Sequence, residues 1–146
     1  MTSEIQPSFA EAIKHEHDEL EGALHRLRLA LADRSETPAV MRSLFHNLAT
    51  ELETHFAHEE RGGYFSEVLA AAPRLQNQIE LLERQHRPLL VMIKQVRDSI
   101  DGRLGATWWE DTAAHFEDFV HHFIEHEVDE NSLLQEAYCQ DIGSDD

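Results

Sequence analysis

The sequence predicts an all-α protein, an up-down-up-down four-helix bundle that occupies a single domain over residues 1–146. Three observations lead to this prediction. Apolar residues recur at alternating spacings of three and four in four segments, as they do on one face of an amphipathic helix. Capping residues, prolines and glycines separate these segments. The connections are short, so we expect successive helices to be antiparallel neighbours.

The first two helices are expected over residues 8–33 and 38–61. Ser8 and Glu11 have the spacing of a capping box, and Thr37-Pro38 reads as an N-cap followed by proline in the first turn. The apolar stripe of the first helix is Phe9, Ile13, His17, Leu20, Leu24, Leu27 and Leu31, and that of the second is Met41, Leu44, Leu48, Leu52, His55 and Glu59. Gly62-Gly63 either ends the second helix or loosens it, and residues 64–71 are compatible with a short helical continuation.

The last two helices are expected over residues 73–100 and 108–139, with a turn at residues 101–105. The third stripe is Leu75, Ile79, Leu82, His86, Leu89, Ile93, Val96 and Ile100, and the fourth is Phe116, Phe119, Phe123, His126, Glu130, Leu133 and Ala137. Pro88 lies inside the third helix and is expected to kink it directly after His86. Thr107 and Glu110 match a second capping box.

Each stripe contains one histidine, and two stripes also contain a glutamate four residues later. Residues four apart share a helix face, about 6 Å apart, so each His–Glu pair points at one spot. With a rise of about 1.5 Å per residue, the four histidines fall within about one to two turns of a common level. The candidate metal ligands are His17, His55, Glu59, His86, His126 and Glu130.

Six such groups in a core without a Lys or Arg on the stripes are costly unless cations neutralise them. A mixed set of imidazoles and carboxylates favours iron or manganese, and two glutamates can bridge two metals. A single core histidine is more often a hydrogen-bonded residue than a ligand, and a lone His–Glu pair is a common surface feature. The prediction therefore rests on the combination of four stripes that each place a histidine near the same level of the bundle.

Some alternatives remain open at this point. His122 with Glu127 is a rival register for the fourth helix, and His122 lies at the edge of the stripe. Glu60 is either a hydrogen-bond partner of a ligand histidine or a solvated carboxylate. The other histidines lie off the stripes and are expected at the surface: His15, His25, His46, His58, His115 and His121.

The composition indicates which kinds of partner and which cellular compartment suit the chain. The formal net charge is −17, which disfavours nucleic acid and anionic membranes as partners. A single cysteine, Cys139, excludes an internal disulfide and suits a reducing compartment. No secretory signal is evident at the N-terminus. We therefore expect a cytoplasmic protein; the sequence indicates no particular protein partner.

Four segments resemble the hemerythrin-like, or HHE cation-binding, family: residues 17–20, 55–60, 83–86 and 126–134. The resemblance implies a non-haem di-iron centre, two Fe ions with a bridging oxo or hydroxo group. The implied ligands are the six residues above, with Glu59 and Glu130 bridging. Oxygen-carrying members have a further histidine one turn away on the third helix, where this chain has Leu82 and Leu90. Their fourth helix also places its His and carboxylate five apart, not four.

These departures favour a protein that binds or senses O₂, or a related small oxidant such as peroxide or NO, over a reversible oxygen carrier. The alternatives are a di-iron enzyme that reduces peroxide or NO or assists iron–sulfur cluster repair, a metal storage or buffering bundle, and a metal-free interaction module.

Overall fold

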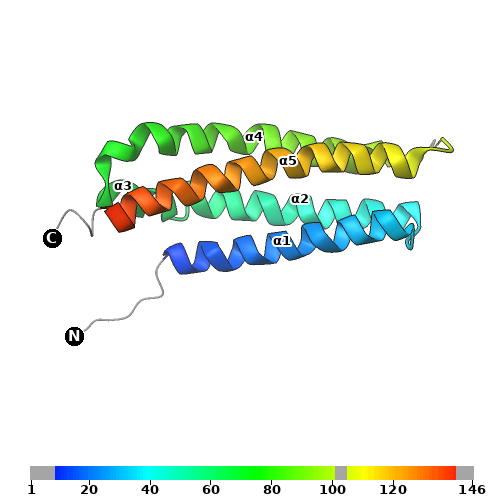
Figure 1. The fold of residues 1–146 in the computed structure, drawn as a ribbon, viewed down its shortest axis with the longest axis horizontal. Helices are drawn as coiled ribbons and strands as arrows, with labels where there is room; N and C mark the ends of the chain where they lie inside the picture. The colour runs from blue at the N-terminus through cyan, green and yellow to red at the C-terminus, as the bar shows by residue number, and fades with distance from the viewer. Residues whose placement is uncertain (1–8, 101–104, 141–146) are drawn as a thin grey trace.

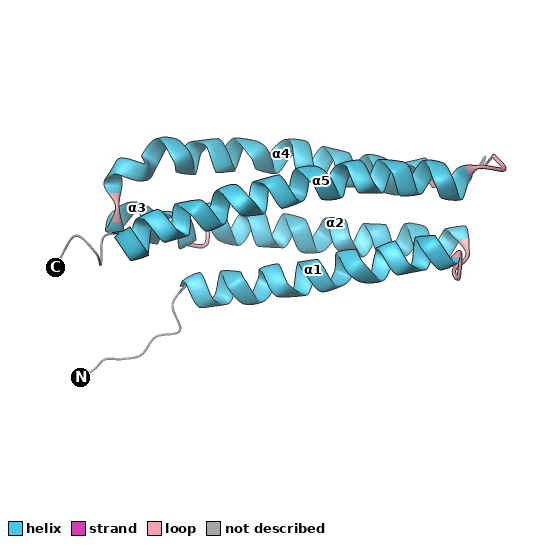
Figure 2. Cartoon of the chain, in the orientation of Figure 1, coloured by secondary structure: helices cyan, strands magenta, loops and turns pink. Residues whose placement is uncertain are grey.

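Four long helices form the molecule, each antiparallel to the next long helix along the chain, and a short helix lies at one end of them (Figure 1). A computed structural model describes residues 9–100 and 105–140 of the chain. Its elements, all of them helical (Figure 2), are α1 (Phe9–Asp33), α2 (Pro38–Glu60), α3 (Tyr64–Ala71), η1 (Pro73–Leu75), α4 (Gln76–Ser99), α5 (Trp108–Leu134) and η2 (Gln135–Gln140). α1 packs on α2, α2 on α4, α4 on α5 and α5 on α1, so the long helices close into the predicted bundle.

The helix starts agree with the sequence at one predicted cap and differ at another. Thr37 caps α2, because its side-chain oxygen accepts a hydrogen bond from the Val40 amide at 3.2 Å. The capping box predicted at Thr107 is wrong: Thr107 is the N-cap of α5, but its side chain accepts no hydrogen bond from a backbone amide, and its hydroxyl donates to Asp111 Oδ2 at 3.0 Å. Ser8 and residues 101–104 lie outside the described residues, so the first capping box and most of the predicted turn stay predictions.

The third and fourth predicted helices are less uniform than expected. The segment that begins at Pro73 opens with the 3-10 turn η1 before α4 starts. Pro88 is exposed and lies inside α4, which continues to Ser99. The fourth helix is α-helical to Leu134 and continues as the π-helical segment η2. The backbone course therefore follows the predicted ranges to within a few residues.

The predicted glycine stop after α2 is confirmed. Gly63 adopts φ 105°, a left-handed conformation that favours glycine, and forms the N-cap of α3. A Cβ on Gly62 would lie 2.6 Å from the carbonyl oxygen of His58. After this close turn the chain forms α3, the short helix that the sequence allowed over residues 64–71. α3 lies at one end of the bundle.

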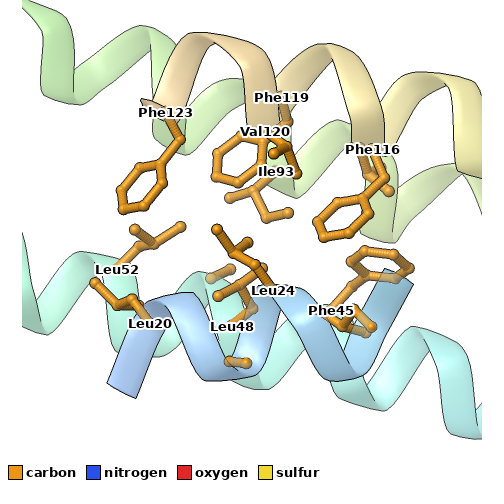
Figure 3. Packing of buried hydrophobic residues seen from close by; sticks show 14 of the residues in the cluster. Leu20, Leu24, Phe45, Leu48, Leu52, Ile93, Phe116, Phe119, Val120 and Phe123 are labelled. Atoms are coloured by element: carbon orange, nitrogen blue, oxygen red, sulfur yellow. The ribbon is translucent and has the colours of Figure 1, made fainter. Parts of the chain in front are cut away.

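The predicted stripes face the core with one exception. Every stripe residue from Ile13 onward is buried except Leu44, which is half-buried, whereas the adjacent Phe45 is fully buried. Phe45 packs edge-on against Phe116 with ring centroids 5.1 Å apart (Figure 3). The second stripe therefore passes through Phe45, and Leu44, which was expected on it, packs against the core cluster while only half-buried.

The buried apolar residues form two separate clusters. The larger runs from Leu20 to Leu31 on α1 and includes Leu48, Phe116 and Phe123 on the facing helices (Figure 3). The smaller gathers around α3: Ile13, Tyr64, Phe65, Val68, Ala72, Leu75, Ile79, Leu82, Leu133 and Ala137. α1, α4 and α5 have buried residues in both clusters, with a buried polar residue between them, whereas the buried apolar residues of α2 all belong to the larger cluster. The described helices include none long and apolar enough to cross a bilayer.

Candidate metal centre

A layer of buried polar residues separates the two apolar clusters. It comprises all six predicted ligands: His17 from α1, His55 and Glu59 from α2, His86 from α4, and His126 and Glu130 from α5. Glu59 and Glu130 have no exposed surface, and His17, the most exposed of the six, is 8% exposed. Helical periodicity puts these residues inside the bundle because each occupies a core position between apolar neighbours.

The six residues form two groups that share one carboxylate. The first group is His17, His55, Glu59 and Glu130, and the second is Glu59, His86 and His126. Within each group the potential ligand atoms lie within 4.8 Å of one another. We call these groups the first and the second position. The rings pair accordingly, with centroids 4.7 Å apart for His17 and His55 and 5.0 Å apart for His86 and His126.

The carboxylate of Glu59 lies between the two positions. Its Oε2 is 3.2 Å from His55 Nε2, and its Oε1 is 3.0 Å from His86 Nε2. Glu130 Oε1 is 3.3 Å from His17 Nε2 and 3.8 Å from His126 Nε2, so Glu130 lies closer to the first position. The implied bridging by both glutamates stays a prediction.

The donor atoms fit bound cations. Among the described residues, no hydrogen bond satisfies the Nε2 atoms of His55, His86 and His126 or the carboxylate oxygens of Glu59 and Glu130, although all are buried. Orphaned buried polar atoms cost about 1–3 kcal/mol each. A metal ion at each position would be coordinated by these lone pairs and would offset that cost.

Three of the histidines are held in place from their outer side. His55 Nδ1 lies 2.6 Å from Glu16 Oε1, His126 Nδ1 lies 2.6 Å from Gln85 Oε1, and His86 Nδ1 hydrogen-bonds Glu60. Each acceptor favours the tautomer that carries its proton on Nδ1, which leaves the Nε2 lone pair directed into the layer. The question of Glu60 is thus resolved, because its carboxylate contacts a predicted ligand.

Charge in this layer is unevenly distributed when no cation is bound. Burial alone would lower the pKa of His17, but Glu130 and Glu59 outweigh it and raise that pKa to about 10. Burial and the neighbouring Glu59 raise the pKa of Glu130 well above its usual value. Burial, together with the charges of the other rings, lowers the pKa of His126 to about 4. Two carboxylates this close resist ionising together, so a proton resides among Glu59, Glu130 and His17 where a cation would otherwise supply the positive charge.

The rival register on the fourth helix is not supported. His122 is exposed, and its Nδ1 lies 2.8 Å from the Asp118 carbonyl oxygen. Glu127 is buried but belongs to neither group; burial raises its pKa to about 7. The six histidines that lie off the stripes are exposed, as predicted.

Sequence reasoning missed two residues, Glu16 and Gln85. Both contact a predicted ligand on another helix, so their role depends on how neighbouring helices are rotated. Glu16 also lies 2.7 Å from the exposed His58. Neither residue occupies a stripe, and the sequence offers no spacing signal that would have singled them out.

Fold and site together define an all-helical, cation-binding four-helix bundle with buried His/Glu groups able to hold metal. The family described as Hemerythrin HHE cation binding domain matches residues 8–138. The chain therefore belongs to this family, as the sequence resemblance predicted. No curated protein and no solved structure gives a significant match.

Proposed function

We propose that this protein is a non-haem di-iron protein that binds O₂ or a related small oxidant and acts as a sensor or protective module. The observation that supports the proposal best is the sharing of Glu59 between two His/Glu groups. Two cations held by groups with a common carboxylate would lie close enough to act on one small ligand.

The donor chemistry favours iron. Imidazole nitrogen and carboxylate oxygen in a mixed set suit iron or manganese, whereas structural zinc sites are closed and four-coordinate. The second position gathers only three residues, which leaves room for an external ligand. Bound iron would supply the redox chemistry and the coordination of that ligand.

The chain's own residues would hold and shield the centre. Glu59 and Glu130 provide the negative charge that two cations require. Glu16, Glu60 and Gln85 fix the tautomers of three histidines. The apolar clusters border the layer on both sides, and this low-polarity environment strengthens the electrostatic interactions within it.

Sensing or processing fits the residues on α4 better than reversible carriage does. Leu82 is 1% exposed in the smaller apolar cluster, and Leu90 is half-buried beside His86. Neither supplies the additional imidazole of oxygen-carrying relatives. The same open second position favours a second candidate function, an enzyme that reduces peroxide or NO.

Anaerobic reconstitution with iron(II) tests the proposal. We expect about two iron ions per chain, and a change of the visible spectrum when air is admitted. A well-folded, iron-replete preparation with one ion or none would contradict the proposal. Turnover of peroxide or NO faster than that of free iron would favour the enzyme.

A further inference from the structure

Gln85 connects the second position to the groove between α4 and α5. Its Oε1 lies 2.6 Å from His126 Nδ1, and its Nε2 donates to Asp129 Oδ2 at 3.1 Å. Gln85 is half-buried, His126 is 2% exposed and Asp129 is exposed. A chain of contacts therefore runs from the surface to a predicted metal ligand.

The contact with Asp129 fixes the orientation of the Gln85 amide. An ionised carboxylate only accepts hydrogen bonds, so the amide nitrogen must face Asp129. The amide oxygen then faces His126, and His126 Nδ1 donates to it. His126 is thus held with its Nε2 lone pair toward the metal layer.

The acceptor on His126 is neutral, whereas the acceptors on His55 and His86 are carboxylates. Glu16 contacts His55 in the first position, and Glu60 contacts His86 in the second. An anionic acceptor raises the basicity of a ligand imidazole, and such partners are worth about 10–100-fold in metal affinity. A neutral amide orients the ring but adds less to its donor strength.

Two further observations distinguish the second position. Its group contains one carboxylate, Glu59, whereas the first position contains two, Glu59 and Glu130. Gln85 and His126 also line a groove of about 700 Å³ between α4 and α5. The hollows beside His55 and His86 are smaller, about 230 and 350 Å³. The second position thus combines less negative charge with the largest of the three hollows that reach a predicted ligand.

We propose that Gln85 is a positioning residue that holds His126 and, being neutral, makes the second position the one that releases its metal first. This inference rests on the proposed function, since it requires a metal at both positions. It assigns different roles to them: the first position retains its ion, and the second exchanges ion and ligand through the α4–α5 groove.

Release of iron(II) from the anaerobic, fully loaded protein to a chromogenic chelator tests the inference. We expect two phases whose rates differ by about tenfold or more. Gln85→Leu should accelerate the fast phase by about tenfold and leave the slow phase unchanged. The corresponding variant at the first position, Glu16→Gln, gives His55 an amide acceptor and should accelerate the slow phase only.

A gain-of-affinity variant separates this role from a merely structural one. Gln85→Glu combined with Asp129→Asn keeps a hydrogen bond between the two side chains but gives His126 an anionic acceptor. It should slow the fast phase by about tenfold, with Asp129→Asn alone as the control. Circular dichroism establishes that each variant is folded.

The outcomes are distinguishable from a failure of the proposed function. Loading to fewer than two ions would count against the di-iron proposal. Loading to two ions followed by a single release phase, or a fast phase that no change at Gln85 affects, would overturn the inference alone.

Discussion

Glu59 Oε1 lies 3.0 Å from His86 Nε2, although the two residues belong to different helices, α2 and α4. The other oxygen of the same carboxylate lies 3.2 Å from His55 Nε2. One buried side chain thus contacts both histidine pairs, so its removal should weaken metal binding at both positions.

Glu59→Ala should therefore abolish the paired centre, whereas Glu130→Ala should weaken the first position more than the second. The reason is that Glu130 is 3.3 Å from His17 but 3.8 Å from His126. Metal content per chain after iron(II) loading is the measurement. His122→Ala is the control and should keep both ions, because His122 is exposed. Loss of iron in that variant would support the alternative in which His122 is a metal ligand.

Glu60→Ala should retain both ions but bind them less tightly, by about 10–100-fold at the second position. Its carboxylate accepts from His86 Nδ1 and therefore acts on the metal only through the ring. Competition with a chelator of known affinity measures the change. An empty site in Glu60→Ala with a full site in Glu59→Ala would show that the two residues have exchanged roles.

The metal-bound protein should be more stable than the metal-free protein. Binding to the native state adds about 2.7 kcal/mol when the free metal concentration is about a hundred times the Kd. For a chain of this size that corresponds to a rise in Tm of about 5–10 °C. Thermal melts with and without iron, followed by circular dichroism, measure it. Equal midpoints would exclude a centre in the core.

Glu127→Gln should stabilise the metal-free protein at neutral and alkaline pH. Burial and the nearby Glu21 raise the pKa of Glu127 to about 7, against the attraction of His17 and His55. The folded state then holds a proton that the unfolded state has lost between about pH 4.5 and 7, so the free energy of unfolding falls as pH rises through this window. Because solvent screens part of the effect, we expect a gain of about 1 kcal/mol at about pH 8 and little at about pH 4. Urea titrations at both pH values measure it; a gain independent of pH would refute this account.

Leu90→His should slow oxidation of the reduced protein in air by several-fold. Leu90 lines the hollow beside His86 on the same helix, one turn further on, where an added imidazole could fill a coordination position. The unmodified protein should oxidise rapidly and bind azide or NO readily. Stopped-flow absorption after mixing with oxygen compares the two. Reversible oxygen binding by the unmodified protein through repeated cycles would contradict the open-position argument.

Periodicity predicted most of the fold because each long helix has one continuous buried face. His17, His86 and His126 were recognisable as core residues since the apolar residues that precede and follow them on their stripes are buried as well. Leu44 and Phe45 could not be separated in this way, because both are apolar and adjacent positions lie about 100° apart on a helix. Packing of Phe45 against Phe116 decided between them.

Contacts between helices account for what the sequence did not reveal. Glu16 and Gln85 contact histidines on neighbouring helices, and these contacts depend on helix rotation rather than on spacing within one helix. Thr107 occupies the N-cap position of α5, but its hydroxyl bonds the Asp111 side chain one turn later and no backbone amide. Local sequence patterns show which side chains could form a contact, but the packing of the helices determines which contacts form.

The separation of the apolar core into two clusters has a consequence for cooperativity. Metal ions in the polar layer would couple the two halves, since each group includes residues of α1, α4 or α5, and these helices have buried residues in both clusters. Without metal, the halves meet across poorly satisfied polar groups. The smaller half, around α3, should then open locally at a lower free energy than the half that contains Phe45 and Phe116. Amide hydrogen exchange would register metal loss first in α3 and the ends of α4 and α5 that pack around it, and last in the opposite half.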